Sequence, residues 1–197
     1  SDASLLLPYN DCGRSPMAWG DFTGDGRPDL IIVQGFHSDP LLSSVEETVI
    51  VMENDGNGGL IERQRFRSYR VLSLHLVDLT GDGRLDIAVA RDLSYGELEL
   101  YENDGTGYFV ALPLNLENLR NVVSISFGDI DNDGLSDMAL LGQGHTAAYL
   151  NAGQGQFRYL AGLDEPLALG GDVALADFDA DGDLDWVAQG YFFDNYW

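Results

Sequence analysis

Hydrophobic residues in this chain form short runs that end near glycine, and these runs predict β-strands. Four of them lie within residues 29–33, 86–90, 137–141 and 185–188, each after an aspartate that closes an acidic segment. Runs of four or five residues are too short for buried helices. Residues 48–53, 97–102 and 145–150 also predict strands, and residues 97–102 alternate polar and apolar positions. Since no segment shows sustained helical periodicity, we expect an all-β protein.

Turn sequences recur in step with these strands. Residues 54–58, 103–107 and 151–155 each combine asparagine and glycine, which tolerate the positive φ angles of tight hairpins. One unit is therefore strand, acidic loop, strand, connection, strand, hairpin, strand, which is the content of a four-stranded antiparallel blade. The first aspartates of the acidic loops lie at 21, 78, 129 and 177, giving intervals of 57, 51 and 48 residues. This period predicts one β-propeller domain, or propeller fragment, with four repeats over residues 1–197.

The acidic segments, here called ladders, span residues 21–29, 78–86, 129–137 and 177–185. Counted from its first aspartate, each ladder has oxygen-bearing side chains at positions 1, 3, 5 and 9 and a glycine at position 6. Such a turn can direct several oxygens inward, joined by the backbone carbonyl of position 7. Calcium requires six to eight oxygen ligands, so we predict up to four Ca²⁺ sites completed by water.

The predicted calcium ligands follow this numbering in each ladder. They are Asp21, Thr23, Asp25, the carbonyl of Arg27 and Asp29; Asp78, Thr80, Asp82, the carbonyl of Arg84 and Asp86; Asp129, Asp131, Asp133, the carbonyl of Leu135 and Asp137; and Asp177, Asp179, Asp181, the carbonyl of Asp183 and Asp185. The third and fourth ladders have aspartate in place of threonine at position 3. Their greater charge predicts tighter binding.

Different metals and different kinds of turn fit the ladders less well. Magnesium demands a near-octahedral shell and dehydrates reluctantly. Zinc and iron prefer cysteine and histidine ligands, but Cys12 and the three histidines lie outside the ladders. Ordinary solvated turns could explain one ladder but are disfavoured for four in phase. An EF-hand needs a glutamate at position 12, where this chain has only apolar residues. These are Ile32, Val89, Leu140 and Ala188.

Residues 126–141, Ser-Phe-Gly-Asp-Ile-Asp-Asn-Asp-Gly-Leu-Ser-Asp-Met-Ala-Leu-Leu, and their three siblings resemble FG-GAP/VCBS repeats. These are the units of integrin-α-type calcium-binding β-propellers, and the resemblance covers residues 17–189. It implies that each ladder joins the first two strands of a blade and that calcium sits there. Only residues 127–128 reproduce the Phe-Gly pair, and residues 33–35, 142–144 and 188–190 replace the Gly-Ala-Pro element. The chain is thus more similar to the VCBS branch than to integrins.

The phase of the repeat leaves two arrangements open. Residues 4–7 would form a fourth strand without its blade, and residues 191–197 would form a third strand without its partner. These halves could complete one blade and close a four-bladed ring, which would avoid an open sheet edge. Alternatively, the chain is a piece of a larger propeller whose edges pair with other sequence or other chains.

The net charge of the chain limits which partners and which locations are expected. The formal charge is −23, with 10 Lys and Arg, which disfavours nucleic acid and anionic membranes. Four calcium ions would bring the charge to −15. No apolar run is long enough for membrane insertion. Because extracellular calcium is far more concentrated than cytosolic calcium, we expect an extracellular or cell-surface protein. Cys12 could link the chain to another chain or be a buried free thiol.

Three function classes follow. The first is a non-catalytic calcium-stabilised binding or scaffold module for adhesion or assembly, with a protein or glycan ligand of unknown identity. The second is a calcium-dependent lectin that uses exposed aromatics, although we expect Trp19, Trp186 and Trp197 to be core residues. The third is a secreted hydrolase or lyase, which is disfavoured because no catalytic motif surrounds any histidine. The histidines are His37, His75 and His145.

Overall fold

The computed structural model describes residues 16–35, 46–91, 98–114, 116, 122–142, 145–163 and 171–190. Every regular element within these ranges is a β-strand, so the described part of the chain has no membrane-spanning helix. The strands are β1 (Met17–Gly20), β2 (Asp29–Gly35), β3 (Glu46–Asn54), β4 (Leu60–Tyr69), β5 (Val71–Val77), β6 (Asp86–Arg91), β7 (Leu98–Asn103), β8 (Phe109–Leu112), β9 (Val122–Gly128), β10 (Asp137–Gly142), β11 (His145–Asn151), β12 (Phe157–Leu163), β13 (Gly171–Ala176) and β14 (Asp185–Gly190).

The strands form antiparallel sheets that follow the repeat. Three sheets have four strands each, in the orders β1-β2-β3-β4, β5-β6-β7-β8 and β9-β10-β11-β12, and β13 pairs with β14 in the fourth. Each sheet begins with a strand that precedes a ladder, and its second strand starts at ladder position 9. The predicted all-β architecture of four-stranded antiparallel blades is therefore confirmed.

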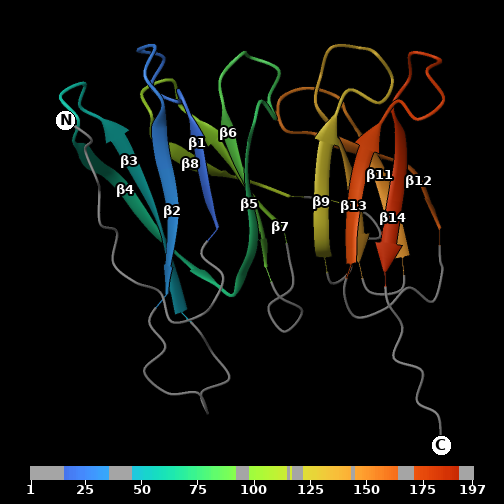
Figure 1. The fold of residues 1–197 in the computed structure, drawn as a ribbon, viewed down its shortest axis with the longest axis horizontal. Coiled ribbons are helices and arrows are strands. Elements are labelled where there is room, and N and C mark those ends of the chain that lie inside the picture. The colour runs from blue at the N-terminus through green and yellow to red at the C-terminus, as the bar shows by residue number, and fades with distance from the viewer. Residues whose placement is uncertain are drawn as a thin grey trace, which may run out of the picture.

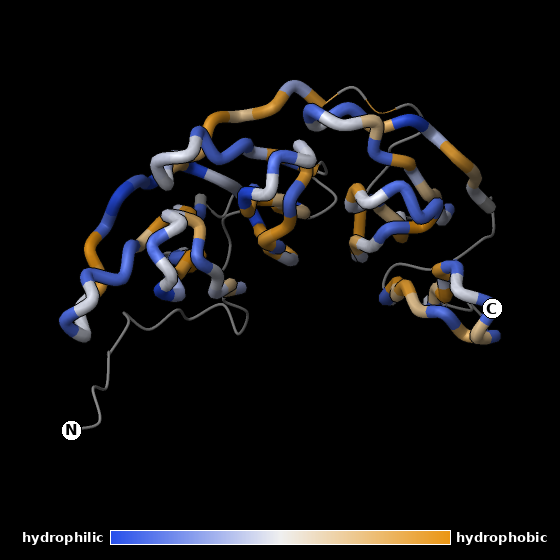
Figure 2. Tube along the Cα trace, turned by 90° about the horizontal axis from the view of Figure 1, so that it is seen from above, coloured by the Kyte–Doolittle hydropathy of each residue, from blue (hydrophilic) through white to orange (hydrophobic). Residues whose placement is uncertain are grey.

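The sheets are arranged in chain order around a common axis. Figure 1 shows them standing side by side, from the sheet of β1 to that of β14. Figure 2 shows that they follow an open arc, with the first and last sheets at opposite ends. Successive sheets approach through their first strands, as β1 contacts β5, β5 contacts β9 and β9 contacts β13. The described residues thus do not close a four-bladed ring. Residues 4–7 and 191–197, which would complete the ring in one of the two arrangements left open by the sequence, lie outside the described ranges.

Successive side chains of the second strand point to opposite faces of its sheet, and they form the core between neighbouring sheets. Side chains at ladder position 11 face the following sheet, and those at positions 10 and 12 face the preceding one. Ile31, at position 11 of the first ladder, accordingly shares a buried cluster with Ile87 and Val89 of the second sheet. Ala88 shares the next cluster with Met138 and others of the third sheet. Because both faces are covered, these strands are apolar throughout, which explains why their sequence signal is strong.

The tryptophans divide between surface and core. Trp186 is partly buried against the cluster between the third and fourth sheets, as expected for a core residue. Trp19 on β1 is 56% exposed, so the expectation that it belongs to the core is wrong. Trp19 pairs with Leu30, on the face of the first sheet that points away from the second sheet. The residues at the same place in the later sheets pack in the clusters between sheets, and they are Leu76, Phe127 and Leu175. Trp197 lies outside the described residues.

Candidate metal centre

All four ladders connect the first and second strands of a sheet, the location that the sequence resemblance implied. The aspartate at position 1 organises the turn by accepting hydrogen bonds from backbone N–H groups. Asp21 accepts from Gly24 at 2.7 Å, Asp25 at 3.0 Å and Gly26 at 2.8 Å. Equivalent bonds to positions 5 and 6 are made by the first aspartate of every other ladder. The ladder is therefore a defined backbone turn and not only a cluster of charge.

Two positions of each ladder have positive φ. Position 6 is always glycine, which adopts this conformation without steric cost. Position 4 also has positive φ, at 75° in Gly24 and 77° in Gly81, but also at 60° in Asn132 and 61° in Ala180. The shared backbone conformation shows that the four turns are alike although position 4 differs in sequence. For Ala180 the conformation is strained, because a Cβ atom disfavours it.

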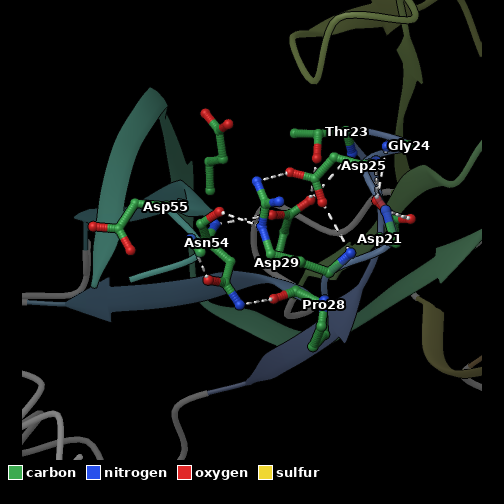
Figure 3. Close-up of polar contacts among 12 residues, drawn as sticks. Asp21, Thr23, Gly24, Asp25, Pro28, Asp29, Asn54 and Asp55 are labelled. Atoms are coloured by element: carbon green, nitrogen blue, oxygen red, sulfur yellow. Dashed lines mark hydrogen bonds and ion pairs between the residues drawn. The ribbon is translucent and has the colours of Figure 1, made fainter. Parts of the chain in front are cut away.

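The aspartate at position 9 is the most enclosed carboxylate of the ladder in the first three sheets. Asp29, Asp86 and Asp137 are all fully buried. Figure 3 shows the first ladder, where Asp29 Oδ2 accepts hydrogen bonds from the N–H groups of Phe22 and Thr23. Its Oδ1 accepts from the N–H of Asn54, the last residue of β3. This carboxylate therefore ties the ladder to the hairpin of its own sheet, in addition to its predicted role as a ligand.

Carboxylate oxygens converge in the third and fourth ladders. Oxygens of Asp129, Asp131 and Asp137 all lie within 4.8 Å of one another, and the same holds for Asp177, Asp179 and Asp185. These are positions 1, 3 and 9, three of the predicted ligand positions. A group of carboxylate oxygens on one turn suits a hard divalent cation such as calcium, which takes oxygen ligands.

The first two ladders differ because a guanidinium group lies beside them. Arg27, at position 7, forms an ion pair with Asp25 at position 5, and its Nε donates to the carbonyl of Asn54 at 3.2 Å. Arg84 repeats this arrangement with Asp82 and the carbonyl of Asn103. The arginine side chains partly compensate the ladder charge. The predicted carbonyl ligand at position 7 is a backbone atom, so it does not compete with this pairing.

The threonines at position 3 also differ from each other. Thr23 Oγ1 donates a hydrogen bond to Asp29 Oδ2 at 3.0 Å. Thr80 Oγ1 is buried and has no hydrogen-bond partner among the described residues. Buried hydroxyl groups without partners are costly, so a ligand at this atom would satisfy it. The unpaired Thr80 Oγ1 therefore supports a cation at the second ladder, although the carboxylate of Asp82 is paired with Arg84.

Burial raises the pKa of Asp86 and of Asp137 above the ordinary value for aspartate, although backbone N–H donors oppose the change in both. The neighbouring carboxylates of Asp82 and Asp131 raise these pKa values further. The ionised form is therefore disfavoured at position 9 in these ladders. A cation held by the same turn would favour it, since an opposite charge nearby stabilises a carboxylate.

The hairpin asparagines form contacts that the sequence did not predict. Asn103 Nδ2 donates to the carbonyl of Phe22 at 2.7 Å, which is position 2 of the preceding sheet's ladder, and to that of Leu85 in its own sheet. Asn151 Nδ2 bonds the carbonyls of Leu79 and Ser136 in the same way, both at 3.0 Å. We call this contact the hairpin latch. The sequence does carry a sign of this contact, since an asparagine stands 24 or 26 residues before the second, third and fourth ladders.

A groove of about 510 Å³ lies on the inner side of the arc, between the first strands of the first three sheets. Trp19, His75, Ser126 and Phe127 are among the residues that line it. Burial lowers the pKa of His75, while Asp172 raises it. The imidazole lies edge-on to the Phe127 ring with 5.6 Å between centroids, and its Nε2 is 3.2 Å from Ser73 Oγ. His145 belongs to β11, away from this strand set, and His37 lies outside the described residues.

Among solved structures, the chain is similar to a lectin of Agrocybe aegerita described for specific recognition of non-reducing terminal N-acetylglucosamine, with 15% identity and a TM-score of 0.46. The match covers 90% of this chain and 60% of that chain, so this chain spans less than two thirds of the length of that protein. No curated protein sequence matches the chain.

The profile of the FG-GAP-like repeat matches three overlapping segments, residues 21–89, 78–140 and 129–188. Each match begins at the first aspartate of one ladder and ends at or near position 12 of the next, in phase with the sheets described above. The affiliation with the VCBS branch stays a prediction. Because the matches together run through all four ladders and most of the sequence, the chain belongs to the FG-GAP-like repeat family.

Proposed function

We propose that this protein is an extracellular, non-catalytic binding or scaffold module in which calcium pins the loops between strands. The observation that carries the proposal is the convergence of three carboxylates in each of the third and fourth ladders. Calcium is the cation best suited to such an oxygen set. The predicted capacity is up to four ions, one for each ladder.

The proposed role of calcium is structural. The ladder turn is held at position 9 to its own hairpin, and at position 2 to the hairpin of the following sheet in the first two sheets. A cation in the turn would thus stabilise contacts within a sheet and between sheets. Without it, carboxylates crowded in one turn repel each other and destabilise the fold. Since the formal charge is −23, this repulsion acts on a chain that is already strongly acidic.

Thermal unfolding with and without calcium tests the proposal. We expect EDTA to lower the melting temperature and added CaCl₂ to restore it, because the ion binds the folded state. An equal concentration of MgCl₂ is the control and should restore it less, since magnesium requires a stricter shell. An unchanged melting temperature in EDTA, together with no heat of calcium binding by titration calorimetry, would refute the assignment.

The proposed extracellular location rests on the calcium supply. Sites built from single flexible turns bind calcium with modest affinity, and such sites fill at the millimolar levels outside cells. FG-GAP-like repeats are also typical of extracellular proteins. The identity of the bound protein or glycan would then be set by surfaces other than the ladders. Assembly with other chains, through open sheet edges or Cys12, is part of the same proposal.

A carbohydrate-binding lectin is the second candidate, and the exposure of Trp19 favours it. Trp19 is 56% exposed and is one of the residues that line the groove, as are His75 and Ser126. An exposed aromatic ring next to hydrogen-bond donors is suited to stacking on a sugar ring. A glycan array should then give selective signals that Trp19→Ala removes. Tyr108→Ala is the matched control, because Tyr108 is 41% exposed and lies outside the groove. Equal loss in both variants would argue against a groove-borne lectin site.

We propose that the groove has no catalytic role. The described contacts of His75 are a hydroxyl and a ring edge, and its pKa is lowered mainly by burial. General acid–base catalysis requires a proton carrier within reach of a reacting group and an orienting partner. Hydrolysis of a glycan or ester that was abolished by His75→Ala, with calcium binding intact, would reverse this proposal.

A further inference from the structure

The side chain at position 7 of the ladder makes different contacts in different sheets. In the first two ladders it is an arginine that donates to the hairpin of its own sheet. In the third ladder it is Leu135, whose Cδ2 lies 2.5 Å from the place of a Cβ atom on Gly81, at position 4 of the second ladder. In the fourth ladder it is Asp183, whose Oδ1 accepts a hydrogen bond from Asn132 Nδ2 at 2.5 Å. Asn132 is position 4 of the third ladder, so the last two ladders reach back to the one before.

The hydrogen bond between Asn132 and Asp183, here called the ladder link, joins the third and fourth ladders directly. Between the second and third ladders the contact is apolar, because leucine has no polar atom in its side chain. Position 4 of the first ladder is Gly24, and a Cβ atom there would meet nothing within 4 Å. Within the described residues, the polar link therefore joins the two ladders in which three carboxylates converge.

Both partners of the ladder link lie among the predicted calcium ligands. Asn132 stands between Asp131 and Asp133, at positions 3 and 5 of the third ladder. Asp183 supplies the predicted carbonyl ligand of the fourth ladder, and its N–H donates to Asp181 Oδ1 at 3.0 Å. The side chain of Asp183 is not one of the predicted ligands. Its hydrogen bond to Asn132 therefore does not compete with a calcium ion in its own ladder.

The ladder link also holds a backbone conformation that asparagine adopts at a cost. Asn132 has a φ of 60°, where the first two ladders have glycine. Asparagine tolerates this region better than most residues, but its Cβ atom still disfavours it. A calcium ion in the fourth ladder would fix the backbone of Asp183 and with it the acceptor of the link. Ordering the turn around Asn132 for a second ion then costs less conformational entropy.

We propose that calcium binds the third and fourth ladders as a cooperative pair, coupled through the ladder link. The proposal rests on the proposed function, since it requires calcium in both ladders. Charge alone predicts the opposite sign, because the aspartates of one ladder attract a cation to the other and an ion bound there reduces this attraction. Positive cooperativity would therefore identify the link. The coupling should be about fivefold, the low end of the usual range, since both side chains are exposed.

Calcium titration calorimetry of the whole chain tests this proposal through the steepness of binding to the two tighter sites. For two like sites, a fivefold coupling gives a Hill coefficient of about 1.4. Asn132→Gly removes the link but keeps the turn, because Gly24 and Gly81 have positive φ at the same position. It should lower the coefficient to about 1 or less. Ala180→Gly is the matched control, since it introduces glycine at position 4 of the fourth ladder and should leave the coefficient at about 1.4.

Substitutions of Asp183 test the other partner of the link. Asp183→Leu introduces the residue type that the third ladder has at position 7, and it keeps the backbone carbonyl. It should abolish the cooperativity. Asp183→Asn keeps an oxygen acceptor for Asn132 and should retain the cooperativity. Circular dichroism in CaCl₂ would establish that each variant folds, which the exposure of both residues makes the expected result.

Three outcomes would overturn the coupling and leave the proposed function intact. They are a Hill coefficient of about 1 or less for the two tighter sites of the unaltered chain, retained steepness in Asn132→Gly, and an equal loss of steepness in Ala180→Gly. The absence of any heat of calcium binding, with a melting temperature that EDTA does not change, would refute both the coupling and the structural role of calcium.

Discussion

Single side chains make the four ladders unequal. The guanidinium of Arg27 pairs with Asp25, and that of Arg84 pairs with Asp82, whereas position 7 is leucine or aspartate in the third and fourth ladders. A calcium ion in the first two ladders must compete with a cation that is already part of the chain. In the other two ladders, three carboxylates converge without such a partner at position 7. We therefore expect two tighter and two weaker calcium sites.

Substitution of position 3 or 5 separates the two classes. Asp131→Asn should remove one of the tighter sites, weakening that site at least about tenfold, because it takes a charge from the converging cluster. The control, Asp25→Asn in the first ladder, also removes one carboxylate but should leave both tighter sites in place. Calcium titration calorimetry counts the sites in each class. If both variants lost the same tight site, or neither did, the arginine side chains would not divide the ladders.

For single residues, the sequence predicts the positions of the oxygen ligands better than it predicts the ion pairs between side chains. The oxygen positions of the ladders follow from spacing alone, and Asp129, Asp131 and Asp137 do come together. The ion pair of Arg27 was not predicted, because the spacing assigns position 7 only a backbone carbonyl. The strain at Ala180 was equally hidden, since alanine gives no sign of positive φ.

At the scale of strands and turns, the hairpins do more than reverse the direction of the chain. The latch asparagine holds its own strand, the turn and the preceding ladder, because its Nδ2 donates and its Oδ1 accepts. Asn103 Oδ1 accepts from the N–H groups of Gly105 and Gly107, while Nδ2 reaches Phe22 of the neighbouring sheet. The residue is completely buried. The hairpin therefore joins two sheets at the same point where the ladder is predicted to hold calcium.

Removing the latch should cost stability where it crosses between sheets. Asn103→Ala leaves the carbonyls of Phe22 and Leu85 without this donor in a buried setting, which costs about 1–3 kcal/mol of unfolding free energy. Asn54→Ala is the matched control, because it removes the same turn contact and a bond to Pro28 at an exposed position. Its cost should be below about 1 kcal/mol.

Urea unfolding of both variants at dilute protein concentration measures this difference. Equal losses in the two variants would mean that the asparagine acts only within its own turn. A larger loss for Asn103→Ala supports coupling between neighbouring sheets.

The predictability of the strands depends on how many of their faces are buried. Second strands such as β6 and β10 are covered on both sides, so their apolar runs locate them within one or two residues. The outer strand β4 carries exposed charged positions over much of its length, and its extent was not predicted. One solvated face removes the continuous apolar signal, and a latch contact leaves no hydrophobic signal at all.

At the scale of the whole molecule, the repeat period predicts the sheets and their order but not the closure of the ring. Closure depends on how far each sheet rotates relative to the next, which small packing contacts determine. Gly20, for example, lets Leu85 of the next sheet approach to 2.6 Å from the place of a Cβ atom. Trp19 shows the same limit, because it is exposed while its equivalents Leu76 and Phe127 pack between sheets, a difference that the local sequence does not indicate.

In the described part of the chain the main contacts between sheets join neighbours in the arc, so stability should vary along it. In repeat architectures, end units with one neighbour open more readily than central ones. The strands β6 and β10 are buried along almost their whole length, whereas β14 alternates exposed and partly buried residues. Hydrogen exchange of the monomer in CaCl₂ should therefore be slowest in β6 and β10, with protection at least about tenfold greater than in β13 and β14. Equal protection of β14 and β10 would contradict a stability that depends on the number of neighbouring sheets.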